Sequence, residues 1–193
     1  MRLLFAVALV LSMSSADIER AQTLARARDS ERQQFHRRYV IDLPGPVVTQ
    51  IEAITEFRRL VIIAEEHVLR GDWMFTRSLR AGQDAIAPTR GLITIRAQVR
   101  FNPMNTFIQS PAYVLALGGG ATNAPVEVLD TQLTPQFSVP FKAKDRKTLS
   151  SLIGATLEAT IAAGRVGQSA RTIAVMLDGQ ETARATVDFA RLD

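Results

Sequence analysis

The sequence contains no cysteine, which excludes disulfides, thiolate zinc sites, a cysteine nucleophile and the lipid-accepting cysteine of a bacterial lipoprotein. It has only two histidines, so most familiar catalytic and metal-binding arrangements lack the residues they need. Its 11 glycines and 8 prolines among 193 residues exclude collagen-like and low-complexity chains. Because 47% of the residues are hydrophobic and 22% are charged, we expect a folded chain with one domain, or one domain and a small appendage.

Lysine is also scarce. The net charge is +4, and of the 23 basic residues only Lys142, Lys144 and Lys147 are lysine. A nucleic-acid-binding protein gathers its positive charge on one face or element, whereas these arginines are spread along the chain. The distribution of charge therefore does not favour a nucleic-acid partner.

No hydrophobic run is long enough to span a bilayer, but the first 16 residues have the pattern of a Sec-type signal peptide. Met1-Arg2 is a short positive start, residues 3–13 are almost all apolar, and Ser14-Ser15-Ala16 places small residues at a cleavage site. The apolar run has 11 residues, well short of the ~20 that span a bilayer. We predict a bacterial mature chain that begins near Asp17, has no transmembrane segment, and is periplasmic or secreted.

Residues 17–43 are predicted to form an N-terminal helical arm. A helix over 17–38 carries a thin apolar stripe among many polar residues, namely Ile18, Ala21, Leu24, Ala25, Arg28 and Phe35. A short strand over 39–43 follows, and Pro44-Gly45-Pro46 breaks the chain. We place the start of the compact domain, residues 44–193, at this break.

Residues 47–70 have two interpretations. In the first, a strand ends at Ile54 and a helix begins after Thr55, which can cap it, and ends at Gly71. The apolar face of that helix would contain Phe57, Leu60, Val61, Ala64 and Val68. In the second, the apolar residues 60–63 belong to a buried strand. We prefer the strand followed by a helix.

From Asp72 onward the pattern is one of short strands. We predict strands at 73–76, 92–101, 113–117, 126–129, 136–139, 155–163, 172–177 and 181–189, with turns at 82–84, 88–91 and 164–169. In the strand over 92–101, Ile93, Ile95, Ala97, Val99 and Phe101 form the apolar set. Asp178-Gly179 favours a type I′ turn between the last two strands.

This pattern predicts a mainly β fold that is α+β at its N-terminus. We expect an antiparallel β-sandwich of immunoglobulin-like or fibronectin-like type, preceded by one or two helices. The cysteine pair and the tryptophan spacing of true immunoglobulin domains are absent, so the analogy is one of class.

The histidines give a weak signal for catalysis or metal binding. His67 follows Glu65 and Glu66, and an imidazole beside carboxylates can act as a general base or a ligand. A facial site of two histidines and one carboxylate would also need His36. Neither histidine has a metalloprotease spacing, so we interpret His67 as a surface residue near a helix end. We predict no cofactor.

Motifs for hydrolysis are missing as well. Neither Gly-x-Ser-x-Gly nor Ser-x-x-Lys occurs, and no lysine-serine pair follows the glycines at 118–120. The carboxylates Glu127, Asp130 and Glu158 lie in the β region. Two of them would form a glycosidase pair only if the fold brought them together.

Two loops are candidate binding sites. The first contains Asn102, Met104, Asn105 and Phe107, where an Asn-Pro dipeptide starts a turn and Asn105 can bond to its own backbone. Loops at one end of a sandwich often carry binding groups, although we expect Met104 and Phe107 to fold back onto the core.

The second loop contains Lys142, Lys144, Arg146 and Lys147, the densest basic run. It could meet phosphate, lipopolysaccharide or an acidic partner. Because no aromatic residue is interleaved, an ordinary solvated loop explains the run better.

These observations favour an exported, non-catalytic β-sandwich that acts as a binding or assembly module in the bacterial cell envelope. A protein partner would bind at the N-terminal helix or at a sandwich edge. The alternative is a periplasmic hydrolase with carboxylates from separate strands. A third hypothesis has the arginine-rich helix 17–38 bound to an anionic surface, either lipid or nucleic acid.

Overall fold

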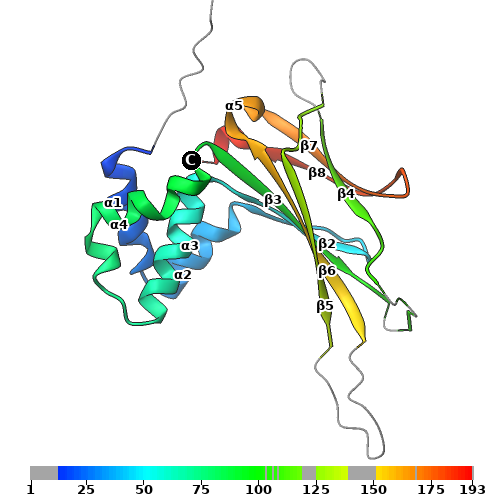
Figure 1. The fold of residues 1–193 in the computed structure, drawn as a ribbon, viewed down its shortest axis with the longest axis horizontal. Coiled ribbons are helices and arrows are strands. Elements are labelled where there is room, and N and C mark those ends of the chain that lie inside the picture. The colour runs from blue at the N-terminus through cyan, green and yellow to red at the C-terminus, as the bar shows by residue number, and fades with distance from the viewer. Residues whose placement is uncertain are drawn as a thin grey trace, which may run out of the picture.

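The computed structural model of the protein describes residues 13–102, 104–105, 107, 109–118, 125–138, 151–167 and 169–192. Helices α1 to α4 lie together beside two antiparallel sheets (Figure 1). The elements in chain order are α1 (Ser15–Ala25), α2 (Asp29–Arg37), β1 (Val40–Asp42), β2 (Val48–Ile54), α3 (Glu56–Leu69), the 3₁₀ helix η1 (Phe75–Arg77), α4 (Leu79–Ile86), η2 (Ala87–Thr89), β3 (Leu92–Arg100), β4 (Tyr113–Gly118), β5 (Asp130–Phe137), β6 (Leu152–Ala162), α5 (Ala163–Val166), β7 (Ala170–Leu177), β8 (Gln180–Asp188) and η3 (Phe189–Arg191).

The predicted single helix over 17–38 is wrong, because α1 and α2 are separated at residues 26–28. The buried residues of α1 share one face, and they are Ile18, Ala21, Gln22 and Ala25. A continued helix would bring Arg28 and Asp29 onto this face. The break avoids burying those charges. It also allows α2 to place Phe35 in the apolar cluster that the helices form.

The preferred interpretation of residues 47–70 is confirmed. β2 ends at Ile54, the hydroxyl of Thr55 accepts the backbone N–H of Arg58 at 3.2 Å, and α3 follows. After α3 the chain turns at Gly71, whose φ of +78° lies in the left-handed region. The helix therefore begins and ends at the residues that its capping signals predict.

The predictions for residues 73–84 are wrong. The strand expected at 73–76 is a turn that leads into η1, and the turn expected at 82–84 lies inside α4. Gly82 is needed there for close packing of two helices, since a Cβ at this position would lie 2.6 Å from Cγ2 of Ile18 in α1. A glycine that punctuates a loop and one that admits a neighbouring helix look the same in the sequence.

The larger sheet has the strand order β1-β2-β3-β6-β5. Its central strand β3 confirms the predicted alternation, because Ile93, Ile95, Ala97, Val99 and the following Phe101 are all buried. The opposite set of β3, which includes Arg96, lies on the outer face of the sheet.

The smaller sheet has the order β4-β7-β8. β7 and β8 form the predicted hairpin, and positive φ angles at Asp178 (50°) and Gly179 (77°) match a type I′ turn.

The strands predicted at 126–129 and 136–139 are corrected. Val126 forms only an isolated bridge to Leu117, and a single strand, β5, runs from Asp130 to Phe137. Pro135, which directly precedes the strand expected at 136–139, lies within β5. An edge strand tolerates proline because the missing N–H can face away from the ladder.

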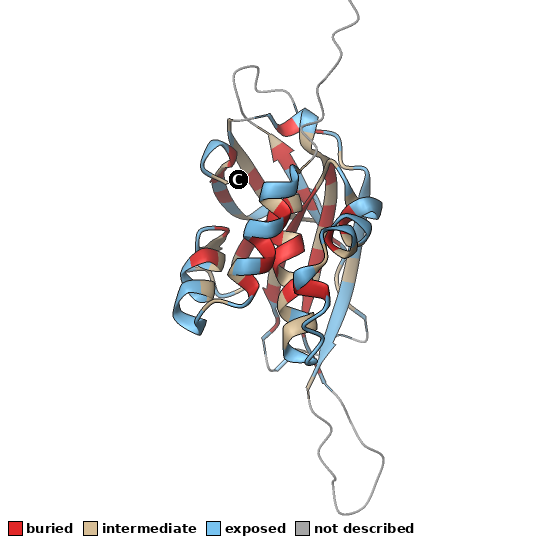
Figure 2. Cartoon of the chain, turned by 90° about the vertical axis from the view of Figure 1, so that its left-hand side faces the viewer, coloured by how far each residue is buried: buried red, intermediate tan, exposed pale blue. Residues whose placement is uncertain are grey.

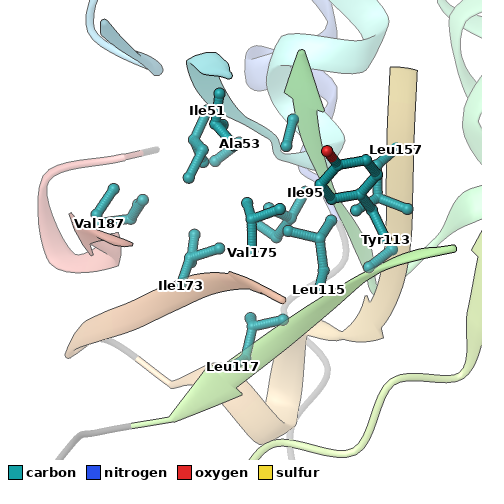
Figure 3. Packing of buried hydrophobic residues seen from close by; sticks show 14 of the residues in the cluster. Ile51, Ala53, Ile95, Tyr113, Leu115, Leu117, Leu157, Ile173, Val175 and Val187 are labelled. Atoms are coloured by element: carbon teal, nitrogen blue, oxygen red, sulfur yellow. The ribbon is translucent and has the colours of Figure 1, made fainter. Parts of the chain in front are cut away.

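The two sheets share one hydrophobic core. Figure 3 shows Ile51, Ile95 and Leu157 of the larger sheet facing Leu115, Ile173 and Val187 of the smaller sheet. A second apolar cluster joins α1, α2, α3, α4 and η1. The antiparallel, two-sheet part of the predicted fold is confirmed, whereas the expected one or two helices were too few. No helix in the described ranges combines the length and the apolar character needed to cross a bilayer.

Replacement of Gly154 by alanine should lower the free energy of unfolding by about 2 kcal/mol, measured by urea denaturation. A Cβ at Gly154 would lie 2.4 Å from the backbone oxygen of Val99, and the β3–β6 ladder prevents the strands from separating. Gly164→Ala is the control, because nothing lies within 4 Å of its Cβ position. Equal losses in the two variants would contradict this account.

Candidate functional site

A row of alternating charges crosses the outer face of the larger sheet. Glu52 of β2 is paired with Arg96 of β3, which is paired with Glu158 of β6. Nη1 of Arg96 lies 3.0 Å from Oε1 of Glu52, and Nε of Arg96 lies 2.6 Å from Oε1 of Glu158. Opposite charges on directly paired residues stabilise a sheet.

Arg58 connects this row to the helices. Its side chain is 5% exposed, and its Nη2 lies 2.6 Å from Oε2 of Glu52. It also donates to the carbonyl oxygen of Ala53 at 2.7 Å and lies over the ring of Tyr39 at 5.1 Å. Burial lowers the pKa of Arg58, and the charge of Glu52 opposes that shift. The buried positive charge of Arg58 therefore depends on the negative charge of Glu52 for its stabilisation.

The charge of Arg96 is stabilised more strongly than that of Arg58. Burial works against the charged form, but the hydrogen bond from Arg96 to Glu158 and the charges of Glu158 and Glu52 outweigh it and raise the pKa of Arg96. Both oxygens of Glu52 are thus held by guanidinium groups. We interpret the row as a structural ion network.

The two histidines lie in separate contacts. Nε of Arg58 donates to Nδ1 of His36 at 3.4 Å, so Nε2 carries the ring proton and donates to Glu65 at 3.0 Å. His67 instead lies 2.8 Å from Asp72 through Nδ1 and stacks on Phe75 at 3.9 Å. The facial site considered from the sequence is not formed, and the described residues contain no group of three or more ligands suited to a metal.

The carboxylates singled out in the sequence do not make an acid–base pair. Glu127 and Asp130 are exposed, and Glu158 is bound to Arg96. The carboxylate that does approach Glu158 is Glu52, with the guanidinium of Arg96 between them. A general acid needs a proton that it can give up, and a general base needs a free oxygen directed at substrate. Here Arg96 occupies the space between Glu52 and Glu158, and both oxygens of Glu52 and one oxygen of Glu158 are bound to guanidinium groups.

The first candidate binding loop forms the turns expected of its asparagines. Oδ1 of Asn102 accepts the N–H of Met104 at 2.9 Å, and Oδ1 of Asn105 accepts the N–H of Phe107 at 3.0 Å. Phe107 contacts Phe101 edge to face at 5.2 Å, although it stays partly exposed. The expectation that Met104 folds onto the core is wrong, since it is 87% exposed. The Nδ2 group of Asn105 donates to the carbonyl oxygen of Asn102 at 2.6 Å and to that of Leu152 in β6 at 2.9 Å, so this asparagine holds the loop to the larger sheet. The second loop, with Lys142, Lys144, Arg146 and Lys147, lies outside the described residues.

An open sheet edge is the candidate site for binding. β4 is paired with β7 on one side, and on the other side the N–H of Val126 donates to the oxygen of Leu117 at 2.9 Å. Because successive residues of an antiparallel strand point their backbone groups to opposite neighbours, the groups of Leu115 face the same side as those of Leu117. Beyond Val126, the described chain places no strand along that side.

β5 lies near this edge, and the smaller sheet covers little of the inner face of β5. Leu133 and Pro135 are paired with Leu157 and Ala155, so they belong to the inner face of the larger sheet. Yet Leu133 is only partly buried and Phe137 is exposed, and Figure 2 shows β5 pale blue along most of its length. The inner face is open here because the smaller sheet has three strands and the larger has five. We call Leu133, Pro135 and Phe137 the β5 stripe.

The sequence analysis did not predict which residues pair in the ion network, although the sequence contains signals that these charged residues have partners. The alternation in 92–101 already placed Arg96 outward. Glu52 among apolar residues and Arg58-Arg59 in the first turn of a helix are unfavourable by themselves, which is a signal that each has a partner. Which residues pair depends on strand order, which alternation does not give.

Scans of family models, curated proteins and solved structures found no match to this chain.

Glu52→Gln should lower the free energy of unfolding by about 3–5 kcal/mol, because it leaves the buried guanidinium of Arg58 without its charge partner. Glu66→Gln is the matched control, since Glu66 forms only an exposed pair with Arg70 at 3.5 Å. That change should cost less than about 1 kcal/mol. If urea unfolding gave similar losses for both variants, the network would not hold the helices to the sheet.

Proposed function

We propose that the protein is exported and acts as a non-catalytic binding or assembly module in the bacterial cell envelope. The observation that supports this most directly is the open edge of β4 beside the uncovered β5 stripe. An edge strand with free backbone groups pairs readily with an extended segment of another chain.

The proposal includes an immunoglobulin-like or fibronectin-like sandwich. Its support is the pair of antiparallel sheets with a shared core, and the chain crosses between them three times, from β3 to β4, from β4 towards β5 and from β6 to β7. Val126 forms a single bridge beside β4, and the chain then leaves to form β5. A partner would supply the strand that the chain does not continue.

The chemistry of the edge defines the partner. It is an extended protein segment whose backbone pairs with Leu115 and whose apolar side chains, at every second position, cover Leu133 and Phe137. The apolar stripe of the N-terminal helices is a weaker candidate, because its residues already pack against α3 and α4. The hydrolase alternative lacks support, since Arg96 lies between the two converging carboxylates.

The test of the edge combines amide exchange with two variants. In the isolated protein the amide of Leu115 should exchange much faster than those of Val114 and Ala116, which face β7. A stoichiometric partner captured from the native envelope fraction should protect the Leu115 amide. The double variant Leu133→Asp/Phe137→Asp should lose this partner.

Gln132→Asp/Thr134→Asp provides the matched control, because these residues lie on the opposite face of the same strand. It should retain both the partner and the protection of Leu115. Slow exchange of Leu115 in the isolated protein would show that the edge is not open. A partner lost equally from both double variants would not bind through the β5 stripe.

Export requires its own test, because Ser14-Ser15-Ala16 also forms the start of α1. The hydroxyl of Ser14 accepts the N–H of Asp17 at 3.2 Å, the Asp17 carboxylate accepts the N–H of Ser14 at 3.1 Å, and hydrogen bonds from Ser14 lower the pKa of Asp17. Deletion of residues 1–16 should abolish export, assayed by fractionation. The intact mass of the exported protein should be that of a chain whose first residue is Asp17. Export of the deleted chain would contradict the proposed location.

A further inference from the structure

Three large apolar side chains are exposed together at the end of α3 and in the turn that follows it. Leu69, Trp73 and Met74 are 79%, 52% and 73% exposed, and we call them the apolar tip. α3 contacts the sheet through its first turn, and Leu69 is about 16 Å further along the helix axis. The turn that links α3 to η1 therefore lies at the end of the helical layer away from the sheets (Figure 1).

The turn that carries the tip is held by specific contacts. The Asp72 carboxylate accepts the N–H of Phe75 at 3.3 Å and lies 2.8 Å from Nδ1 of His67. His67 stacks on the buried ring of Phe75, and the Thr76 hydroxyl donates to the oxygen of Trp73 at 3.0 Å. The hydrogen bond with His67 lowers the pKa of Asp72. Trp73 and Met74 are thus presented by a preformed turn.

Three exposed arginines, Arg70, Arg77 and Arg80, flank the tip along the chain, and the exposed carboxylate of Asp72 lies in the same turn. Arg70 and Arg80 are exposed and form only exposed pairs, with Glu66 at 3.5 Å and with Asp84 at 3.7 Å. Arg77 is exposed and has no ion pair with any described residue. Such exposed pairs contribute little, so the arginines can exchange their partners for lipid phosphates at small cost.

We propose that the apolar tip inserts into the headgroup region of an anionic lipid bilayer. A protein partner would need about 800 Å² of this surface for a standard interface, and one turn offers much less. A bilayer needs no such area, because a few side chains can enter it while basic residues remain at the phosphates. Tryptophan suits this boundary since its ring is apolar and its N–H is polar. This inference is independent of the open edge of β4.

Trp73 is the only tryptophan in the chain, so its fluorescence reports the tip alone. Vesicles of phosphatidylethanolamine and phosphatidylglycerol should shift its emission to shorter wavelength and sediment the protein. Phosphatidylcholine vesicles should do so far more weakly. Arg77→Gln should weaken binding to the anionic vesicles about fivefold. Raising the salt concentration should weaken it as well.

The double variant Leu69→Ser/Met74→Ser keeps the tryptophan and should lose the shift and the sedimentation. Both residues are exposed, so the fold should be retained, which circular dichroism can verify. The control is Met104→Ser, an exposed methionine in a different loop, which should bind as the unchanged protein does. Equal binding to both vesicle types, or no shift at millimolar lipid, would overturn the proposal. The proposal would also be overturned if envelope proteins without any lipid produced the same shift of the Trp73 emission.

Discussion

The contact between Arg58 and Glu52 joins the two parts of this molecule. Arg58 lies in the first turn of α3, where a positive charge opposes the helix dipole, and its side chain is almost completely buried. Glu52 compensates it from β2, and Arg96 then links the same carboxylate to Glu158 on β6. A buried charge without a partner is costly, so the position of α3 on the sheet is narrowly defined. The other helices pack on α3, so the position of α3 also sets their position relative to the sheet.

The second constraint is the unequal width of the sheets. Three strands cannot cover five, and β5 is the strand left uncovered. Pro135 removes one donor from its outer edge, which is a common protection against unwanted pairing. Among the described residues no strand pairs with β4 at Leu115, whose backbone groups face away from β7. The two surfaces that we connect with function, this edge and the apolar tip, lie on different parts of the molecule, so the protein could hold a partner and a membrane at once.

Sequence reasoning succeeded where one local signal was sufficient. Thr55 and Gly71 defined α3, the alternation in 92–101 defined β3 and its buried face, and Asp178-Gly179 defined the hairpin. It failed where the same residue has two uses. Gly82 lies in a predicted turn and instead admits α1, and Pro135 lies outside the strands predicted from the sequence and is instead part of an edge strand. Of the candidate site residues, the asparagines formed their turns as predicted, whereas Met104 did not reach the core.

Local patterns were enough to predict which segments alternate between apolar and polar residues and which residues cap a helix or form a tight turn, because these properties depend on neighbours within a few residues. The composition was enough to exclude cysteine chemistry. The three-dimensional arrangement was needed to show that Glu52 contacts both Arg58 and Arg96, that His36 and His67 lie apart, and that no strand of the described chain pairs with β4 at Leu115. Those facts depend on strand order and on the packing of distant segments. Alternation along a strand shows which face a residue occupies, but it does not show which strand lies beside it.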